Sequence, residues 1–230
     1  MANAESFWNE QYQKSPFQKG KEPSPFLLEM LPRMRTGKVL DVGMGEGRNA
    51  VYLAQKGYSV KGFDASQTAV EHAQTLARDT GVSIDAQRVD LDLFLFGLME
   101  YDSIVMTFFK PPTVRYYSEM IRALKQGGTL LVESWMIEEL TEIIGPEESY
   151  RDFYFRPNEL LNHLKGMRIL FYQEGLVGKR HVVQCLAQKP VDKDVAKFGL
   201  FDMQSSGSGG SKDAGPSIHQ KLAEELFKKK

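Results

Sequence analysis

The apolar residues between positions 38 and 190 fall into short runs separated by stretches of helical periodicity. Continuous apolar runs predict buried strands, whereas apolar residues spaced three and four apart predict helices with one buried face. The strands predicted in this way cover residues 39–42, 58–63, 83–89, 101–108, 129–133, 168–173 and 181–188. This alternation predicts an α/β fold, with an open, doubly wound, mostly parallel sheet and helices on both faces.

Two of the predicted helices carry clear end signals or a clear apolar stripe. Ser66 is placed to cap the first of them, and Gly81 follows it where a left-handed C-terminal cap is favoured. Its buried face is predicted to consist of Ala69, Val70, Ala73, Leu76 and Ala77. Pro111 and Pro112 suit the first turn of the other helix. Its buried stripe is predicted to consist of Val114, Tyr117, Ile121 and Leu124.

The ends of the chain depart from this regular pattern. We divide the chain into an extension at 1–37 that covers the active site, a domain at 38–190 and a flexible tail at 191–230. Only the short segment EGLVGKR separates the last two strands, which predicts an antiparallel hairpin. In the tail, residues 204–217 have a linker composition and residues 218–230 have helical spacing. The latter segment either docks on a protein partner or an anionic surface, or is a frayed or appended remnant.

Charge and cysteine content narrow the partners and the compartment. The formal net charge of −1 provides no long-range attraction for phosphate backbones, so nucleic acid is not expected as a partner. Cys185 is the one cysteine, which excludes an internal disulfide and fits a reducing cytosol. We find no secretory leader and no apolar stretch long enough to span a membrane, so we expect a cytoplasmic protein.

Three glycines at alternate positions follow the first predicted strand directly. In VLDVGMGEGRN, Gly43, Gly45 and Gly47 lie between a strand and a helix, where bare backbone and free helix amides approach a ligand closely. The alternative is an ordinary tight turn. Arg48 occupies the position where a dinucleotide-binding GxGxxG motif requires glycine, so the spacing favours a ligand without phosphates. Arg48 itself either pairs with a core carboxylate or is exposed at the helix start.

Acidic residues at the ends of the predicted strands suggest how such a ligand is held. Asp64 is placed to accept hydrogen bonds from both ribose hydroxyls, although a strand-end cap is the alternative. Asp90 is placed to accept the exocyclic amine of an adenine while Leu91 packs on the ring, and Asp92 competes for this role. Asp41 would be costly to bury alone, so we expect it to orient the glycine turn or to meet the amino group of the ligand.

The segment VLDVGMGEGRNAVYLAQKGYSVKGFDAS, with the later VDL and LKQGGTLLVE, resembles the class I S-adenosylmethionine-dependent methyltransferases. The resemblance extends over about residues 5 to 189. It implies a seven-stranded Rossmann-like fold with strand order 3-2-1-4-5-7-6, the last strand antiparallel, and S-adenosyl-L-methionine as the cofactor. Ala65 and Thr107 join the candidate cofactor-binding residues. Within the class, FWNEQY, EPSPFL and FRPNELLNHLKGMRILFYQEG are similar to the tellurite-resistance methyltransferase branch.

The acceptor is expected to be a small molecule. After the fourth predicted strand the chain reads TFFKPP, without the Asn or Asp of nucleobase and amide aminomethylases, so those acceptors are disfavoured. A thiol, a chalcogen oxyanion such as tellurite or selenite, or a similar soft nucleophile needs little general-base help. Arg180 and His181 are the catalytic candidates, the alternative being a surface arginine and a strand-start histidine. Aromatic candidates near the acceptor are Phe7, Trp8, Tyr12, Phe108 and Phe109.

Two other functions remain open on the sequence alone. The first is a module that binds the cofactor without methyl transfer and uses the tail as an adaptor. The second is a nicotinamide dehydrogenase, which the glycine spacing already disfavours. Turnover of labelled cofactor separates the first from an enzyme, and NADH binding tests the second.

Overall fold

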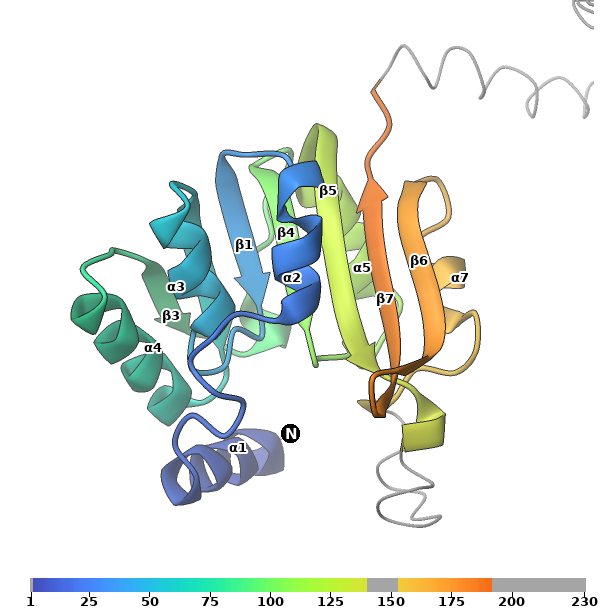
Figure 1. Ribbon diagram of the computed structural model, residues 1–230. Coiled ribbons are helices and arrows are strands. Elements are labelled where there is room, and N and C mark those ends of the chain that lie inside the picture. The colour runs from blue at the N-terminus through green and yellow to red at the C-terminus, as the bar shows by residue number, and fades with distance from the viewer. Residues whose placement is uncertain (1, 140–152, 192–230) are drawn as a thin grey trace, which may run out of the picture. The chain divides into compact units, whose positions relative to one another are not determined.

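A seven-stranded sheet in the order β3-β2-β1-β4-β5-β7-β6 forms the centre of the protein (Figure 1). The computed structural model describes residues 2–139 and 153–191. The strands are β1 (Lys38–Val42), β2 (Ser59–Asp64), β3 (Asp85–Arg88), β4 (Tyr101–Thr107), β5 (Leu124–Trp135), β6 (Arg168–Val177) and β7 (Arg180–Gln188). Strands β1 to β5 pair in parallel, whereas β7 is antiparallel to both β5 and β6. The predicted fold class and strand order are confirmed.

Helices cover both faces of this sheet. They are α1 (Ala2–Lys14), α2 (Pro25–Met30), α3 (Arg48–Gln55), α4 (Gln67–Asp79), α5 (Arg115–Ala123) and α7 (Glu159–His163), with 3-10 turns η1 (Leu31–Arg33) and η2 (Leu91–Leu93). Helices α2, α3 and α4 lie in front of the sheet in Figure 1, and α5 lies behind it. Alternate residues of β1 show the reason, because Val39 packs with α2 and α3 while Leu40 packs with α5.

Helix α4 follows its sequence signals closely. The hydroxyl of Ser66 accepts the N–H of Ala69 at 3.2 Å, and Gly81 has a φ of +72° beyond the helix end. All members of the predicted buried face, Ala69, Val70, Ala73, Leu76 and Ala77, are buried. Both end signals and the apolar stripe of α4 are therefore confirmed.

The prediction for α5 is wrong in its start and in part of its stripe. The helix begins at Arg115, so Pro111 and Pro112 precede it rather than forming its first turn. Val114 is 57% exposed, whereas Tyr117 is buried as expected. The buried helical residues are Tyr116, Tyr117, Met120 and Ala123. The face that packs on the sheet therefore includes both tyrosines rather than Val114.

The final hairpin is present, with longer strands than predicted. Strand β6 continues to Val177, which pairs with Arg180, so that Gly178 and Lys179 alone form the turn. Gly178 has a φ of +64°, a conformation that favours glycine in two-residue hairpin turns. The segment predicted as a turn is therefore mostly strand.

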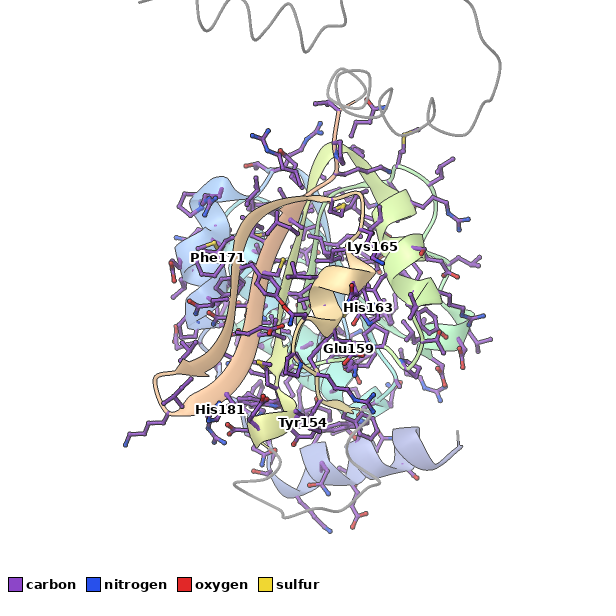
Figure 2. The ribbon with its side chains drawn as sticks, turned by 90° about the vertical axis from the view of Figure 1, so that its right-hand side faces the viewer. Tyr154, Glu159, His163, Lys165, Phe171 and His181 are labelled. Carbon is purple, nitrogen blue, oxygen red and sulfur yellow. The ribbon has the colours of Figure 1, made fainter. Side chains whose placement is uncertain are left out.

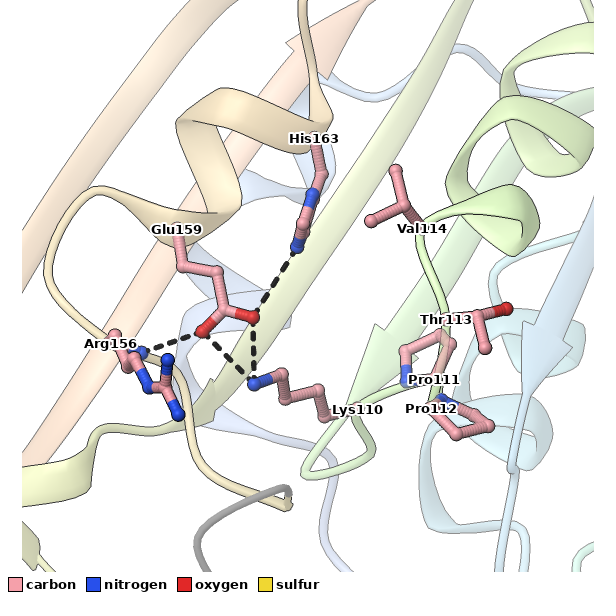
Figure 3. A pocket seen from close by; sticks show the side chains of 8 residues that line it. All are labelled: Lys110, Pro111, Pro112, Thr113, Val114, Arg156, Glu159 and His163. Carbon is pink, nitrogen blue, oxygen red and sulfur yellow. Dashed lines mark hydrogen bonds and ion pairs between the residues drawn. The ribbon is translucent and has the colours of Figure 1, made fainter.

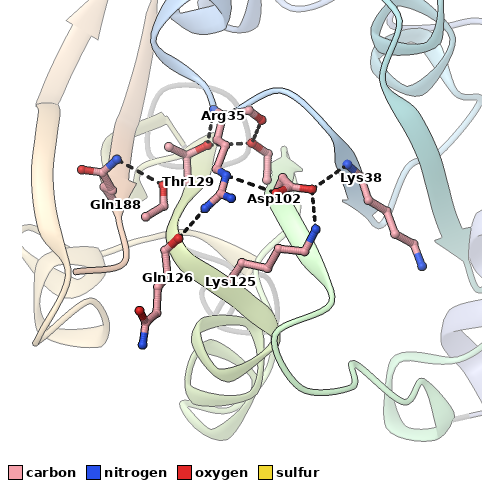
Figure 4. A network of polar contacts seen from close by, with 9 residues as sticks. Arg35, Lys38, Asp102, Lys125, Gln126, Thr129 and Gln188 are labelled. Carbon is pink, nitrogen blue, oxygen red and sulfur yellow. Dashed lines mark hydrogen bonds and ion pairs between the residues drawn. The ribbon is translucent and has the colours of Figure 1, made fainter. Parts of the chain in front are cut away.

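A polar network joins β1, β4 and β5 where these strands begin, at the end of the sheet opposite to the glycine turn (Figure 4). The carboxylate of Asp102, whose side chain is 10% exposed, accepts the Lys38 N–H at 3.0 Å and the Lys125 ammonium at 2.7 Å. The Arg35 guanidinium lies 3.1 Å from the same carboxylate. Burial alone would raise the pKa of Asp102, but these donors lower it. Among the described residues, no helix has the length and apolar character needed to cross a membrane.

Candidate active site

The glycine turn between β1 and α3 requires glycine at all three alternate positions. Gly43, Gly45 and Gly47 have φ values of +63°, +54° and +79°, in the left-handed region that other residues avoid. A Cβ atom on Gly47 would lie 2.6 Å from the Cβ of Ala73. Gly47 therefore has a packing role, because it lets α3 approach α4.

Two aromatic side chains border the same turn. A Cβ on Gly45 would lie 3.0 Å from the hydroxyl of Tyr12, and one on Gly43 would lie 3.0 Å from the ring of Phe109. Tyr12 belongs to α1, and burial beside the carboxylate of Asp64 raises its pKa. The side chain of Tyr12 therefore stays a neutral hydroxyl next to the turn.

Asp64 lies at the end of β2 and binds the glycine turn. Its carboxylate accepts the N–H of Gly45 and the N–H of Ser66, each at 2.9 Å. Burial raises the pKa of Asp64, and the amides of Ser66, Gly45 and Ala65 oppose this shift. The strand-end cap that the sequence left open is therefore present. It does not exclude ribose binding, because each carboxylate oxygen has a further lone pair.

Asp41 lies in β1 and is 1% exposed. Among the described residues, neither carboxylate oxygen has a partner within hydrogen-bond limits, although the Ala50 amide is near enough to favour the charged form slightly. Burial raises the pKa of Asp41 to about 7, while the charge of Arg48 opposes the shift. A ligand amino group bound next to the glycine turn would give this buried carboxylate the hydrogen-bond donor that it lacks.

The two candidates for the adenine contact have different surroundings. Asp90 is exposed and caps η2 by accepting the N–H of Asp92 at 3.2 Å. Asp92 accepts hydrogen bonds from the Arg115 guanidinium and the Tyr116 hydroxyl. Leu91, beside them, packs against the core. The carboxylate of Asp92 is thus committed to α5, which leaves Asp90 as the better candidate.

Thr107, at the end of β4, belongs to a chain of buried polar contacts. Its hydroxyl accepts a hydrogen bond from the side-chain NH₂ of Asn49 at 2.8 Å. The side-chain carbonyl of Asn49 in turn accepts the backbone N–H of Ser24 at 2.9 Å. The Ser24 hydroxyl donates to Glu133 at the end of β5, and Gln184 donates to the same carboxylate at 2.7 Å. These contacts align the ends of β4 and β5 with the start of α3.

Glu46, inside the glycine turn, is a buried carboxylate that sequence reasoning missed. It accepts the N–H of Phe17 at 2.6 Å and lies 2.8 Å from Nδ1 of His72 on α4. The ring of Phe17 stacks on that of His72, with centroids 5.5 Å apart. The sequence offered one signal for Glu46, which is its position between two glycines of a turn expected to be buried. A carboxylate buried there needs hydrogen-bond or ion-pair partners.

Cations converge on two rings at the ends of β4 and β5. The rings of Phe108 and Trp135 are 4.4 Å apart, and the ammonium of Lys19 lies 5.5 Å and 5.0 Å from their centroids. Arg48 approaches Phe108 at 5.7 Å and Arg180 approaches Trp135 at 5.4 Å. Burial and the charges of Arg48 and Arg180 lower the pKa of Lys19. We call these five residues the cation–aromatic cluster.

Glu139 binds both of the sequence-predicted catalytic residues. The side chain of Arg180 donates to Glu139 at 2.5 Å, and the backbone N–H of His181 donates to the same carboxylate at 2.8 Å. Figure 2 shows His181 and Tyr154 at the same end of the sheet, and the charges of Glu139 and Arg180 both act on the pKa of Tyr154. Arg180 therefore joins the cation–aromatic cluster, with a buried carboxylate fixing its position.

The other sequence candidates are placed as follows. The guanidinium of Arg48 donates to the carbonyl of Lys19 at 3.0 Å. Among the described residues no carboxylate lies at salt-bridge distance from it, although Glu133 and Asp41 are near enough to raise its pKa against the effect of burial. Trp8 is 43% exposed and its ring lies 5.9 Å from that of Tyr12. The side chain of Phe7 and the tail at 192–230 lie outside the described residues.

The arrangement fits a phosphate-free nucleoside cofactor. A bare turn, a buried carboxylate without a partner and an acidic strand end with spare lone pairs meet at the ends of β1 and β2. Asp41, Asp64 and Asp90 would hold its amino group, ribose and adenine respectively. Lys19, Trp135 and Glu139, in and beside the cation–aromatic cluster, carried no sequence motif and could be found only from the packing.

Comparisons with known proteins agree with this geometry. The sequence profile of the family described as "Methyltransferase domain" matches residues 39–128. The 2-heptyl-1-hydroxyquinolin-4(1H)-one methyltransferase of Mycobacteroides abscessus is 29% identical over 118 residues, which cover 48% of this chain and 52% of that protein. The probable S-adenosyl-L-methionine-dependent methyltransferase TehB of Haemophilus influenzae is 27% identical over 151 residues, which cover 63% of this chain and 50% of that protein.

The structural match to TehB covers more of this chain than the two sequence matches do. The crystal structure of TehB from Haemophilus influenzae superposes with a TM-score of 0.62 and 22% identity, covering 79% of this chain and 67% of that one. In sequence, by contrast, the chain spans only about half the length of the two relatives. In its profile match and its seven-stranded fold, the chain is similar to the class I S-adenosylmethionine-dependent methyltransferases, and TehB is among the relatives that it resembles.

Proposed function

We propose that the protein transfers the methyl group of S-adenosylmethionine to a small, soft nucleophile such as a thiol or a chalcogen oxyanion. The observation that carries this proposal is the position of the cation–aromatic cluster at the ends of β4 and β5, beside the glycine turn at the ends of β1 and β2. Arg48 connects the two regions, because it begins α3 directly after the turn and also contacts Phe108.

The cluster favours an anionic acceptor. Burial lowers the pKa of Lys19, and repulsion from the charges of Arg48 and Arg180 lowers it further. An oxyanion or thiolate placed among them would relieve that repulsion, and the two rings would exclude water from its reacting atom. Glu139 keeps Arg180 in place, and its charge offsets part of the repulsion at Lys19.

Positioning supplies most of the catalysis in this proposal. The cofactor, when bound, provides an electrophilic methyl group on a sulfonium sulfur. Alignment of the two reactants by the glycine turn and the cluster lowers the barrier by up to roughly 7 to 11 kcal/mol. A soft anionic acceptor needs no general base, so Arg180 acts by holding charge and His181 is not required to move a proton.

Turnover of labelled cofactor with a panel of acceptors tests the proposal. Purified protein is incubated with methyl-labelled S-adenosylmethionine and dithiothreitol, selenite or tellurite, and labelled methyl product is measured. We expect product with at least one of the three. Tight cofactor binding without product from any of them would favour the non-methylating adaptor instead. Quenching of NADH fluorescence would favour the dehydrogenase.

Variants of the hairpin test the acceptor side separately. Arg180→Gln should raise KM for the acceptor about tenfold, since it removes a charge-assisted contact, and should leave the Kd for S-adenosylhomocysteine unchanged. Lys179→Gln, which removes the neighbouring charge in the hairpin turn, is the matched control and should change neither. An unchanged KM in Arg180→Gln would remove this residue from the acceptor site.

A further inference from the structure

A cleft of about 410 Å³ lies beside the segment that follows β4 (Figure 3). Its lining residues are Lys110, Pro111, Pro112, Thr113, Val114, Arg156, Glu159 and His163. Phe109, directly before Lys110, contacts the glycine turn instead. The segment 109–114 therefore separates this cleft from the candidate cofactor site, and none of the residues assigned above lines it.

The polar wall of the cleft has a fixed geometry. The side chain of Lys110, which is 10% exposed, lies 2.8 Å from the carboxylate of Glu159 and donates to the Tyr154 carbonyl at 2.8 Å. Glu159 also accepts the N–H of Arg156 at 2.8 Å, and Nε2 of His163 lies 3.4 Å from it. Burial alone would raise the pKa of Glu159, but the Arg156 amide and the Lys110 ammonium lower it.

This wall carries more positive than negative charge. The ammonium of Lys110 balances the carboxylate of Glu159, and the guanidinium of Arg156 remains. Among the described residues, that guanidinium has no hydrogen-bond or ion-pair partner. Its planar fork matches a carboxylate in two parallel hydrogen bonds.

The opposite wall is apolar. Pro111, Pro112 and Val114 line it, and Val114 is 57% exposed. Small-molecule sites commonly measure about 300 to 1,000 Å³ and combine apolar walls with a few polar groups. The volume and the two walls together suit a small molecule with an apolar body and one anionic group.

We propose that this cleft binds a small organic carboxylate. The carboxylate pairs with Arg156 next to Lys110, and the apolar body lies against Pro111, Pro112 and Val114. The site does not depend on methyl transfer, so it stands or falls independently of the function proposed above.

Titration of the full-length, ¹⁵N-labelled protein tests the proposal. Benzoate serves as the probe, and the backbone amide shifts of Thr113, Val114 and Arg156 are followed by NMR. We expect saturable shifts at these amides. Benzamide, which lacks the charge, should bind at least about fivefold more weakly, and inorganic phosphate, which lacks the apolar body, should do the same. Shifts that are absent up to about 10 mM benzoate, or equal affinity for either comparison compound, would overturn the proposal.

Surface variants locate the binding. Arg156→Gln should weaken benzoate binding at least about fivefold, whereas Arg168→Gln, an exposed arginine on β6, should leave it unchanged. Val114→Asp places a like charge on the apolar wall and should abolish binding. All three positions are exposed, so thermal unfolding should match the wild type. Wild-type affinity in both Arg156→Gln and Val114→Asp would exclude this cleft.

Discussion

Asp64 accepts the backbone N–H of Gly45 at 2.9 Å, so the acidic end of β2 holds the middle residue of the glycine turn. The same carboxylate binds the start of α4 through Ser66. It therefore shapes the turn in addition to any contact it makes with a ribose. Variants that change the charge and the shape of this side chain separate the two roles.

Replacement of Asp64 should weaken cofactor binding. Asp64→Ala removes both acceptor oxygens and should raise the Kd for S-adenosylhomocysteine at least tenfold, or about 1.4 kcal/mol. Asp64→Asn keeps one acceptor oxygen for the Gly45 amide and should bind more tightly than the alanine variant. Isothermal titration calorimetry measures both, with the exposed Asp79→Ala as control. Unchanged affinity in Asp64→Ala would refute the ribose assignment.

The buried carboxylate of Asp41 should cost stability at neutral pH. Burial raises its pKa from 3.8 to about 7, so the folded protein binds more protons than the unfolded chain between these values, and stability falls as the pH rises through that window. Asp41→Asn should therefore unfold at the same temperature as the wild type near pH 3.5. At pH 8 it should be more stable by about 1 kcal/mol or more. A thermal melt series from pH 3.5 to 8 measures the difference.

The same variant should bind the cofactor less well. If Asp41 receives the amino group of the ligand, Asp41→Asn gains stability and loses affinity for S-adenosylhomocysteine. A variant that is more stable and equally tight would show that the carboxylate acts on the turn alone.

Gly47 should tolerate alanine less well than Gly57 does. Both have left-handed φ values, +79° and +84°, but a Cβ on Gly47 would lie 2.6 Å from Ala73, whereas one on Gly57 would meet no atom of the described residues within 4 Å. Gly57→Ala should lower the free energy of unfolding by about 1 kcal/mol, because only the strain of the left-handed backbone is added. Gly47→Ala should cost about 2 to 4 kcal/mol, because overpacking is added. Urea unfolding gives both values, and equal costs would contradict the contact between α3 and α4.

Asp102 should stabilise the fold above acidic pH. Its donors lower the pKa below 3.8, so its contribution is present above that value and is lost as the pH falls through the folded pKa. Asp102→Asn should be destabilised by about 1 to 2 kcal/mol at pH 7, and the difference should shrink below about pH 3. Thermal melts at both pH values test this, with Asp79→Asn as the exposed control. A pH-independent difference would point to packing instead.

The alternation of strands and helices was predictable because it depends on local periodicity. The caps of α4 at Ser66 and Gly81 were equally local and are confirmed. The start of α5 was not, because Pro111 and Pro112 suit a helix start and an irregular segment equally well. Pro112, Thr113 and Val114 stay exposed, and the helix begins only at Arg115, directly before the buried Tyr116 and Tyr117.

The candidate site likewise has a part that could be predicted from local sequence and a part that could not. The glycine turn and Asp64 are close in sequence and carry a motif, whereas the cation–aromatic cluster and the contacts around it are assembled from separate segments. Glu139 and Arg180 are 41 positions apart, and Ser24 and Glu133 are 109 apart. Pairings of this kind follow from the completed fold, and periodicity gives no information about them.

Helix α2 limits where this protein can be cut. Phe26, Leu27 and Met30 are buried together with Val39 and Leu53, and Ser24 donates to Glu133. A truncated protein starting at Lys38 would retain the entire stretch that matches the family profile, yet it would expose that cluster to water and remove one of the two hydrogen-bond donors of the buried Glu133 carboxylate. Expression trials and fusion designs should therefore start upstream of Ser24, because the limits of sequence similarity are narrower than those of the unit that folds.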